Sequence, residues 1–122
     1  MANKILVVDD DPQILKILQK RLSTSGYEVI CAADGEEAVQ MTRNQRPQLI
    51  ILDVMMPRMD GTEAARIIRE DEMTKGIPII YLTALKSEDD DQLEGNFGNS
   101  IVLGKPIDMP KLLEKIRQLA PG

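Results

Sequence analysis

The sequence predicts an α/β protein built on one open sheet of five parallel strands. Short apolar runs alternate five times with segments that have helical periodicity, which favours parallel strands joined by right-handed helical crossovers. The run at 49–52 is continuously apolar and is followed by turn-forming residues, as expected for a central strand buried on both faces. We therefore expect helices on both faces of the sheet.

The composition limits the classes of function. The chain has 122 residues, a net charge of −5, one cysteine and no histidine. These counts exclude an internal disulfide, histidine catalysis and histidine metal ligands. No long basic run is present, which argues against direct nucleic-acid binding. No apolar run approaches the ~20 residues of a membrane span, and the start does not resemble a signal peptide, so we expect no membrane contact and a cytoplasmic location.

The first half of the chain alternates strand, helix, strand, helix. A strand at 4–8 precedes a helix that begins at Pro12, with Asp11 as its N-cap, and ends before Gly26. Five apolar residues are expected on its buried face: Ile14, Leu15, Ile17, Leu18 and Leu22. A strand at 27–33, nearer an edge, follows. Asp34 and Glu37 have the spacing of a capping box for the second helix, which carries Ala38 and Met41 inward.

The second half continues the alternation after Pro47 ends the second helix. The central strand at 49–52 leads to a helix with Asp60 and Glu63 as a capping-box pair and an apolar face of Ala64, Ile67 and Ile68. A fourth strand is expected at 76–82, with Pro78 near its start. The acidic segment at 86–96 predicts a short, exposed helix. A fifth strand at 101–103 and a final helix capped by Asp108 complete the pattern, with four leucines and isoleucines on one face: Leu112, Leu113, Ile116 and Leu119.

Polar residues stand where the strands end. Asp9 and Asp10 follow the first strand, Asp53 the third, Thr83 the fourth and Lys105 the fifth. In a doubly wound sheet of order 2-1-3-4-5, the first and third strands are neighbours at the switch point, so their carboxylates would meet in one shallow pocket. Three carboxylates that close repel one another unless a cation joins them, and all-oxygen ligands suit Mg²⁺, with Mn²⁺ as the alternative.

The same strand ends suit phosphoryl chemistry. A lysine ammonium and a threonine hydroxyl beside a metal-bound carboxylate can bind the oxygens of a tetrahedral oxyanion. Asp53 can then act as a nucleophile on phosphorus. No glycine-rich phosphate loop is present, so the site is not built for a nucleotide.

Four motifs resemble the receiver domain of bacterial two-component response regulators: VVDD at 7–10, LDVMMPRMDG at 52–61, LTA at 82–84 and GKP at 104–106. The resemblance covers essentially the whole chain. It implies the flavodoxin-like (βα)₅ fold and a single receiver domain at 1–122 with no output domain in this chain. It also implies that Asp53 accepts a phosphoryl group from a phosphohistidine on a sensor histidine kinase or a histidine phosphotransferase.

The resemblance also implies the roles of the other site residues. Asp10, Asp53, Asp9 through water, and the backbone carbonyl of Met55 would hold Mg²⁺. Thr83 and Lys105 would bind the phosphoryl oxygens, with a cis peptide before Pro106. Phosphorylation would change the surface formed by 86–96, the fifth strand and the last helix, where an unknown downstream protein binds; a homodimer through that surface is left open.

Two departures from the family pattern stand out. Receivers usually place an aromatic residue three positions before the lysine, where this chain has Val102. Tyr81 precedes Thr83 by two residues on the same strand face, and we consider it a weak substitute. Met55 and Leu85, two residues beyond Asp53 and Thr83, are apolar and cannot orient water, so we expect a long-lived phosphorylated form.

Two rival functions remain open. A receiver-shaped interaction protein that works without phosphorylation would explain Val102 and the irregular 86–96 segment. A Mg²⁺-dependent phosphohydrolase with an aspartate nucleophile is disfavoured, because such enzymes commonly carry a second acid where Met55 stands. The expected protein is therefore a phosphoacceptor rather than an enzyme in the usual sense.

Overall fold

The computed structural model describes residues 3–54, 61–83, 101–104 and 106–119. Five parallel strands form one sheet in the order β2-β1-β3-β4-β5, which confirms the predicted fold and strand order. The strands are β1 (Lys4–Val8), β2 (Glu28–Ala32), β3 (Leu49–Asp53), β4 (Ile79–Thr83) and β5 (Ile101–Gly104). The helices are α1 (Pro12–Thr24), α2 (Gly35–Gln45), α3 (Gly61–Glu70) and α4 (Met109–Leu119).

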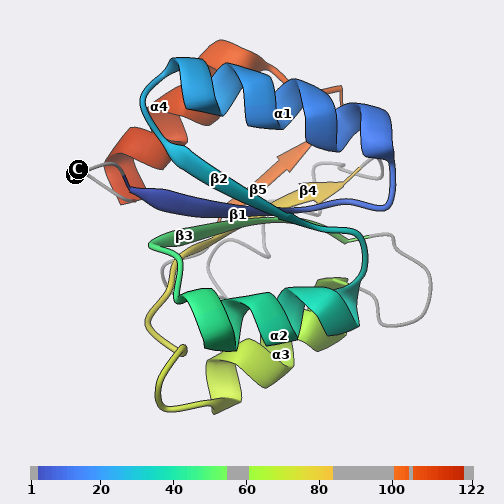
Figure 1. Ribbon diagram of the computed structural model, residues 1–122, viewed down its shortest axis with the longest axis vertical. Coiled ribbons are helices and arrows are strands. Elements are labelled where there is room, and N and C mark those ends of the chain that lie inside the picture. The colour runs from blue at the N-terminus through green and yellow to red at the C-terminus, as the bar shows by residue number, and fades with distance from the viewer. Residues whose placement is uncertain (1–2, 55–60, 84–100, 105, 120–122) are drawn as a thin grey trace.

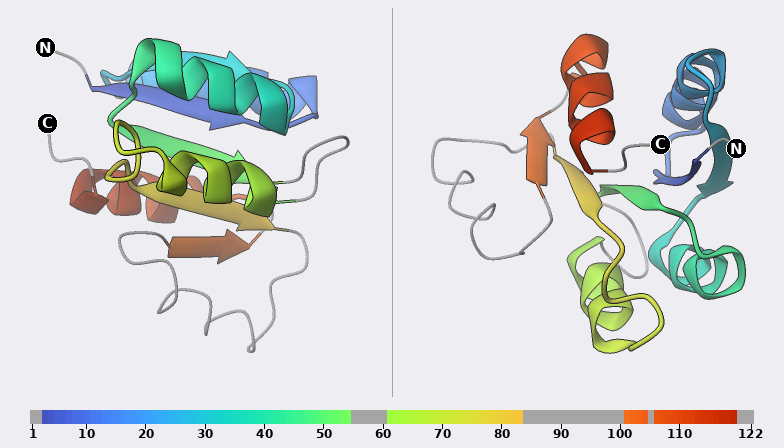
Figure 2. Two further views of the ribbon diagram at one scale, coloured as in Figure 1. Left: turned by 90° about the horizontal axis from the view of Figure 1, so that it is seen from below. Right: turned by 90° about the vertical axis from the view of Figure 1, so that its left-hand side faces the viewer.

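The sheet is covered on both sides. Figure 1 and the right-hand view of Figure 2 show α1 and α4 on one side, the α1/α4 face, and α2 and α3 on the other, the α2/α3 face. Successive strand residues point to opposite faces, so each strand can contribute side chains to the apolar clusters on both faces of the sheet. Ile51 packs in the cluster under α1 and α4, whereas Leu52 packs in the cluster under α2 and α3.

Strand β3 lies at the centre and explains the unbroken apolar run. All five of its residues are buried, because β1 and β4 flank it and helices cover both faces. Burying one leucine or isoleucine side chain contributes about 1.5–3 kcal/mol, so this strand holds a large share of the stabilising apolar contacts. Asp53 ends the strand and is 3% exposed, the one charged residue in it.

Three aspartates cap helices as the sequence predicts. The Asp11 carboxylate accepts the Gln13 N–H at 2.9 Å at the start of α1. Asp34 accepts the Glu37 N–H at 2.9 Å at the start of α2. Asp108 accepts the Lys111 N–H at 3.1 Å at the start of α4. Each cap satisfies a backbone donor that the first helical turn leaves without a partner.

The fourth strand begins later than predicted. Residues 71–77 form turns, and β4 starts at Ile79, after Pro78 rather than before it. The Thr74 and Lys75 N–H groups both donate to the Asp71 carbonyl, at 3.0 and 2.8 Å, and the Ile77 N–H donates to the Thr74 carbonyl at 3.0 Å. The first two residues of the predicted strand, Gly76 and Ile77, therefore continue this turn instead. Pro78 has no N–H, but its carbonyl still accepts the Ile50 N–H at 3.0 Å.

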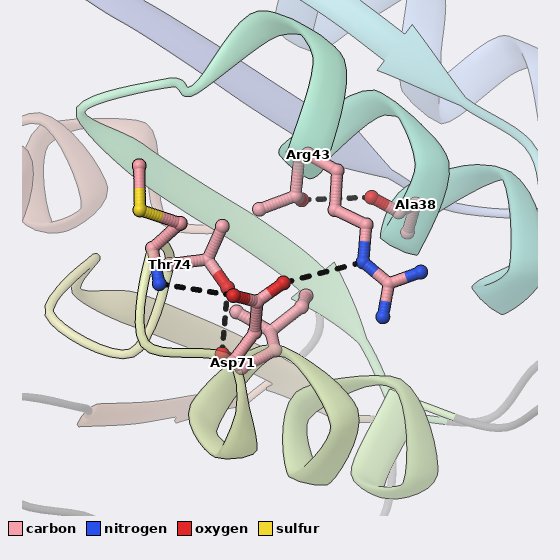
Figure 3. A network of polar contacts seen from close by, with 7 residues as sticks. Ala38, Arg43, Asp71 and Thr74 are labelled. Carbon is pink, nitrogen blue, oxygen red and sulfur yellow. Dashed lines mark hydrogen bonds and ion pairs between the residues drawn. The ribbon is translucent and has the colours of Figure 1, made fainter.

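Polar contacts of Asp71 join this turn to α2 (Figure 3). One carboxylate oxygen accepts the Met73 N–H at 2.9 Å, and the other lies 3.3 Å from Arg43 Nε on α2. The buried Thr74 hydroxyl donates to the Ile68 carbonyl at 2.7 Å, near the end of α3. These contacts hold α2 and α3 together at the amino-terminal edge of the sheet.

The buried face of α1 is narrower than predicted. Leu18 and Leu22 are fully buried, but Ile17 is 55% exposed and does not belong to the core. Ile17 lies one residue, about 100° of helical rotation, from Leu18, so the two side chains cannot share one narrow apolar stripe. The predicted 86–96 helix and the Asp60 cap lie outside the described residues. Among the described helices, none is long and apolar enough to cross a membrane.

Arg46 generates a prediction about stability. It ends α2 in the left-handed region, with φ of 47° and ψ of 64°, where a β-carbon is unfavourable and glycine is preferred. Arg46→Gly should raise the free energy of unfolding by about 1 kcal/mol, measured by urea titration. The matched control is Gly26→Ala, at a φ of 99°, which should lower it. A less stable Arg46→Gly protein would contradict this account.

Candidate functional site

Two neighbouring strands bring acidic residues to the carboxyl edge of the sheet. Asp9 follows β1 directly, and Asp53 is the last residue of β3. The two strands pair in register, with Val8 opposite Leu52, so the next residue on each strand reaches the same level. Asp9 is 1% exposed and Asp53 is 3% exposed. The pairing therefore places two buried carboxylates side by side.

Asp10 completes a cluster of three carboxylates. One oxygen from each of Asp9, Asp10 and Asp53 lies within 4.8 Å of the others, as the sequence predicts for the strand ends. Asp10 is exposed, so the cluster has two buried members and one open to solvent. Like charges this close repel one another, and the cluster is therefore a place where a cation lowers the energy.

The turn from β1 to α1 sets the direction of the three consecutive aspartates. Asp9 accepts the Asp11 N–H through a carboxylate oxygen at 2.9 Å, and its own N–H donates to the Ala32 carbonyl on β2 at 3.2 Å. Asp11 turns away and caps α1. Consequently the carboxylates of Asp9 and Asp10 belong to the acidic cluster, whereas the carboxylate of Asp11 caps α1. The Asp9–Asp11 hydrogen bond is a feature that sequence patterns did not indicate, because it depends on the shape of the turn.

Thr83 lies on the strand next to Asp53. It ends β4, is 7% exposed and pairs with Gly104, while Asp53 pairs with Leu82 one residue earlier. The Val54 N–H donates to the Leu82 carbonyl at 3.0 Å, which keeps β3 and β4 together beyond Asp53. The hydroxyl therefore belongs to the same edge of the sheet. Lys105 and Met55, the other predicted site residues, lie outside the described residues.

The cluster fits a hard divalent cation. Its donors are carboxylate oxygens only, with neither histidine nor cysteine among them. Mg²⁺ and Mn²⁺ prefer such ligands, and Mg²⁺ commonly keeps several waters while binding one or two carboxylates. The exposed position of Asp10 leaves the cluster accessible to a hydrated ion.

The position where receivers usually carry an aromatic residue is buried in this protein. Val102 is 2% exposed and lies opposite Tyr81, which is also 2% exposed, in the β4–β5 pairing. Both belong to the core cluster of the α2/α3 face. The one aromatic side chain at this level of the described β4–β5 pair is therefore on β4, not β5.

Comparison with known families identifies a matching profile. The profile described as "Response regulator receiver domain" matches residues 5–117, nearly the whole chain. The match includes both strands that carry the acidic cluster and the strand that ends in Thr83.

Individual relatives agree with the profile. The chain is 39% identical over 119 residues to the Bacillus subtilis alkaline phosphatase synthesis transcriptional regulatory protein PhoP, covering 98% of this chain and 49% of that protein. It spans about half the length of the first curated relatives it matches. Among solved structures it is similar to Vibrio cholerae chemotaxis protein CheY4 (34% identity, TM-score 0.88, covering 98% and 99% of the two chains). It also matches a Chloroflexus aurantiacus putative response regulator (31% identity, TM-score 0.90, covering all of both chains).

Metal affinity tests the carboxylate cluster. Mg²⁺ at ten times its dissociation constant should stabilise the wild-type protein by about 1.4 kcal/mol, and Asp10→Asn should remove most of this gain. With a chelator present, Asp10→Asn should instead be more stable than wild type by on the order of 1 kcal/mol, because one of three repelling charges is gone. Thermal unfolding with and without Mg²⁺ measures both effects. Equal stabilisation of both proteins by Mg²⁺ would show that the ion binds elsewhere.

Proposed function

Since this chain belongs to the response regulator receiver domain family, we propose that it is a phosphoacceptor in a two-component phosphorelay. Family membership makes it a signalling module rather than a conventional enzyme. The observation that carries the proposal is the cluster of Asp9, Asp10 and Asp53 at the end of β1 and β3. One buried carboxylate at the end of a central strand, with a threonine on the next strand, is a suitable acceptor for a phosphoryl group.

Asp53 is the nucleophile in this proposal. An oxygen of its carboxylate attacks the phosphorus of a phosphohistidine on a partner protein, and the bond between phosphorus and the imidazole nitrogen breaks. The products are an acyl phosphate on Asp53 and a free histidine on the donor. The donor is a sensor histidine kinase or a histidine phosphotransferase, since this chain contains no histidine of its own. Water later cleaves the acyl phosphate and restores Asp53.

The residues around Asp53 would bind the metal ion that stabilises negative charge during this transfer. Asp10 and Asp53, with Asp9 through water and the Met55 carbonyl, would bind Mg²⁺. Bound Mg²⁺ supplies positive charge to the phosphoryl oxygens, which carry most of the developing negative charge. Asp9 is held by the Asp11 N–H, so it enters the site with its orientation already fixed. A fixed carboxylate loses little conformational entropy when the ion binds.

Thr83 and Lys105 would bind the transferred group. The Thr83 hydroxyl donates one hydrogen bond to a phosphoryl oxygen, and the Lys105 ammonium pairs with another. Burial of Thr83 strengthens such a hydrogen bond, since little water competes for the hydroxyl. The transfer thereby changes the contacts at the ends of β4 and β5, and β5 is itself part of the proposed output surface of 86–96, β5 and α4.

Two observations favour a second candidate, an interaction module that works without phosphorylation. Val102 replaces the aromatic residue that receivers usually carry, and Tyr81 beside it is already fully buried. Binding of a beryllium fluoride phosphoryl mimic with Mg²⁺ separates the two candidates. We expect binding, seen as a shift of the Thr83 amide resonance. A folded protein that binds no mimic would favour the interaction module.

Covalent modification tests Asp53 directly. Incubation with acetyl phosphate and Mg²⁺ should add the mass of one phosphoryl group to the intact wild-type protein, and a chelator should prevent the addition. Asp53→Asn should show no adduct, because an amide oxygen is a poor nucleophile. Glu70→Gln, which removes an exposed carboxylate at the end of α3, should be modified like wild type. An adduct on the Asp53→Asn protein would refute the assignment of Asp53.

The lifetime of the acyl phosphate tests the expectation for Met55 and Leu85. Both side chains are apolar, so neither can orient an attacking water. Replacing both with asparagine should speed hydrolysis on the order of tenfold, because a positioned polar group assists the attack. The decay of phosphorylated protein is followed by intact mass over time. Unchanged decay in the double variant would remove the basis for a long-lived phosphorylated form.

A further inference from the structure

Three consecutive aspartates between β1 and α1 divide into two roles. Asp9 and Asp10 each place a carboxylate oxygen in the acidic cluster, within 4.8 Å of Asp53. Asp11 instead caps α1, where its carboxylate accepts the Gln13 N–H at 2.9 Å. The three side chains have the same chemistry, and aspartate is among the best residues for a helix cap. The local structure must therefore select which of them becomes the cap.

The other two capped helices use a longer cap spacing than α1. Asp34 accepts the Glu37 N–H at the start of α2, and Asp108 accepts the Lys111 N–H at the start of α4. In both helices the donor lies three residues after the aspartate, whereas the donor to Asp11 lies two residues after it. Both spacings are normal, because a cap side chain can reach the second or the third helical N–H.

Asp10 lies three residues before Gln13 and so has the spacing of an alternative cap. If α1 began one residue earlier, at residue 11, the Asp10 carboxylate could accept the Gln13 N–H. Asp10 is exposed, and among the described residues none forms a hydrogen bond or an ion pair with its carboxylate. An Asp10 carboxylate used as a cap would be drawn away from the acidic cluster. The residue at which α1 begins therefore determines whether the cluster keeps its third carboxylate.

Two adjacent residues hold the start of α1 at Pro12. The Asp11 carboxylate already occupies the Gln13 N–H, and the Asp11 backbone is extended, with φ of −93° and ψ of 110°. Pro12 disfavours helical geometry at residue 11, because the proline ring clashes with the backbone N–H and the β-carbon of the residue before it. Since residue 11 stays outside the helix, its N–H donates to the Asp9 carboxylate at 2.9 Å.

We propose that Asp11 and Pro12 are positioning residues for the metal site, because they fix the start of α1 and thereby keep Asp9 and Asp10 in the cluster. This role rests on the proposed function, in which the cluster binds Mg²⁺. Neither residue belongs to the cluster itself. Asp11 orients Asp9 through its N–H, and its carboxylate occupies the donor that Asp10 would otherwise accept. Residues that orient metal ligands commonly change metal affinity about 10–100-fold when they are replaced.

Two variants with the same net charge test the proposal. Asp11→Ala combined with Pro12→Ala removes the cap and the proline, whereas Asp11→Asn removes the same negative charge and keeps both. The dissociation constant of Mg²⁺ is measured from amide resonance shifts during a Mg²⁺ titration of the full chain. Asp11→Asn should raise it by about threefold at most, since one nearby charge is lost in salt solution. The double variant should raise it about tenfold beyond the Asp11→Asn value.

The metal-free proteins give a second measurement. In the double variant the ¹³Cα resonance of residue 11 should move into the helical range, because α1 then begins one residue earlier. In Asp11→Asn this resonance should stay in the extended range, and the N–H of residue 11 should remain protected from exchange by its hydrogen bond to Asp9.

A control separates positioning from a general loss of stability. Ile116→Val, in the buried part of α4, should destabilise the protein about as much as loss of a helix cap does. Because residue 116 lies outside the cluster, this variant should leave the dissociation constant of Mg²⁺ within about twofold of wild type.

Labelling with acetyl phosphate separates metal binding from chemistry. In the double variant, the Mg²⁺ concentration for half-maximal labelling should rise about tenfold beyond the Asp11→Asn value, as the dissociation constant does. The labelling rate at saturating Mg²⁺ should stay within about twofold of the Asp11→Asn rate, because Asp53 is unchanged.

Three results would overturn the proposal. These are a double variant that binds Mg²⁺ as tightly as Asp11→Asn, a residue 11 that stays extended in the double variant, and an Ile116→Val protein whose binding is weakened as much as that of the double variant. A wild-type protein that binds no Mg²⁺ would refute the metal site and this role together. A wild-type protein that binds Mg²⁺ but accepts no phosphoryl group would refute only the proposed function.

Discussion

The parallel pairing of β1 with β3 is the constraint on which the site depends. Val8 lies opposite Leu52, so Asp9 and Asp53 emerge at one level. A register slip of one residue would turn every side chain of one strand to the opposite face and place its apolar residues against the wrong helices. Two buried carboxylates about 4 Å apart repel one another by about 4 kcal/mol at an effective dielectric constant of about 20, whereas each of the several buried leucines and isoleucines of these strands contributes about 1.5–3 kcal/mol. The core is therefore strong enough to hold the acids together.

Features set by local chemistry could be predicted from the sequence. A continuous apolar run identified β3, and three aspartates before helical patterns identified the starts of α1, α2 and α4. The alternation of elements predicted a doubly wound parallel sheet, and the flavodoxin-like order 2-1-3-4-5 then predicted the convergence of Asp9, Asp10 and Asp53. Pro12 also distinguished the role of Asp11 from that of Asp9 and Asp10, because a proline in the first turn marks the residue before it as the helix cap.

Features set by contacts between distant residues could not be predicted in this way. The start of β4 depends on a turn that the carbonyls of Asp71 and Thr74 extend as far as Ile77, and the Asp71 carboxylate in turn contacts Arg43 on α2. The position of Ile17 depends on how α1 is rotated against the sheet, and an apolar residue next to Leu18 gives no local sign of that rotation. The same limit applies to the hollow that Ile14, Ile17 and Met109 line, because Ile17 and Met109 lie far apart in the sequence and meet only after α1 and α4 pack on one face.

The acidic cluster and the far end of α1 are nearly independent electrostatically. Arg21 lies ten residues beyond Asp11, a helical rise of about 15 Å, whereas charges in physiological salt are screened over about 8 Å. A change of charge at Asp10 or Asp53 is therefore felt weakly at the carboxyl end of α1. The start of α4 is different, because Pro106 and Ile107 precede it directly and follow the strand whose end would bind the phosphoryl group. Any effect of phosphorylation on α4 must consequently pass through movement of this short connection rather than through charge.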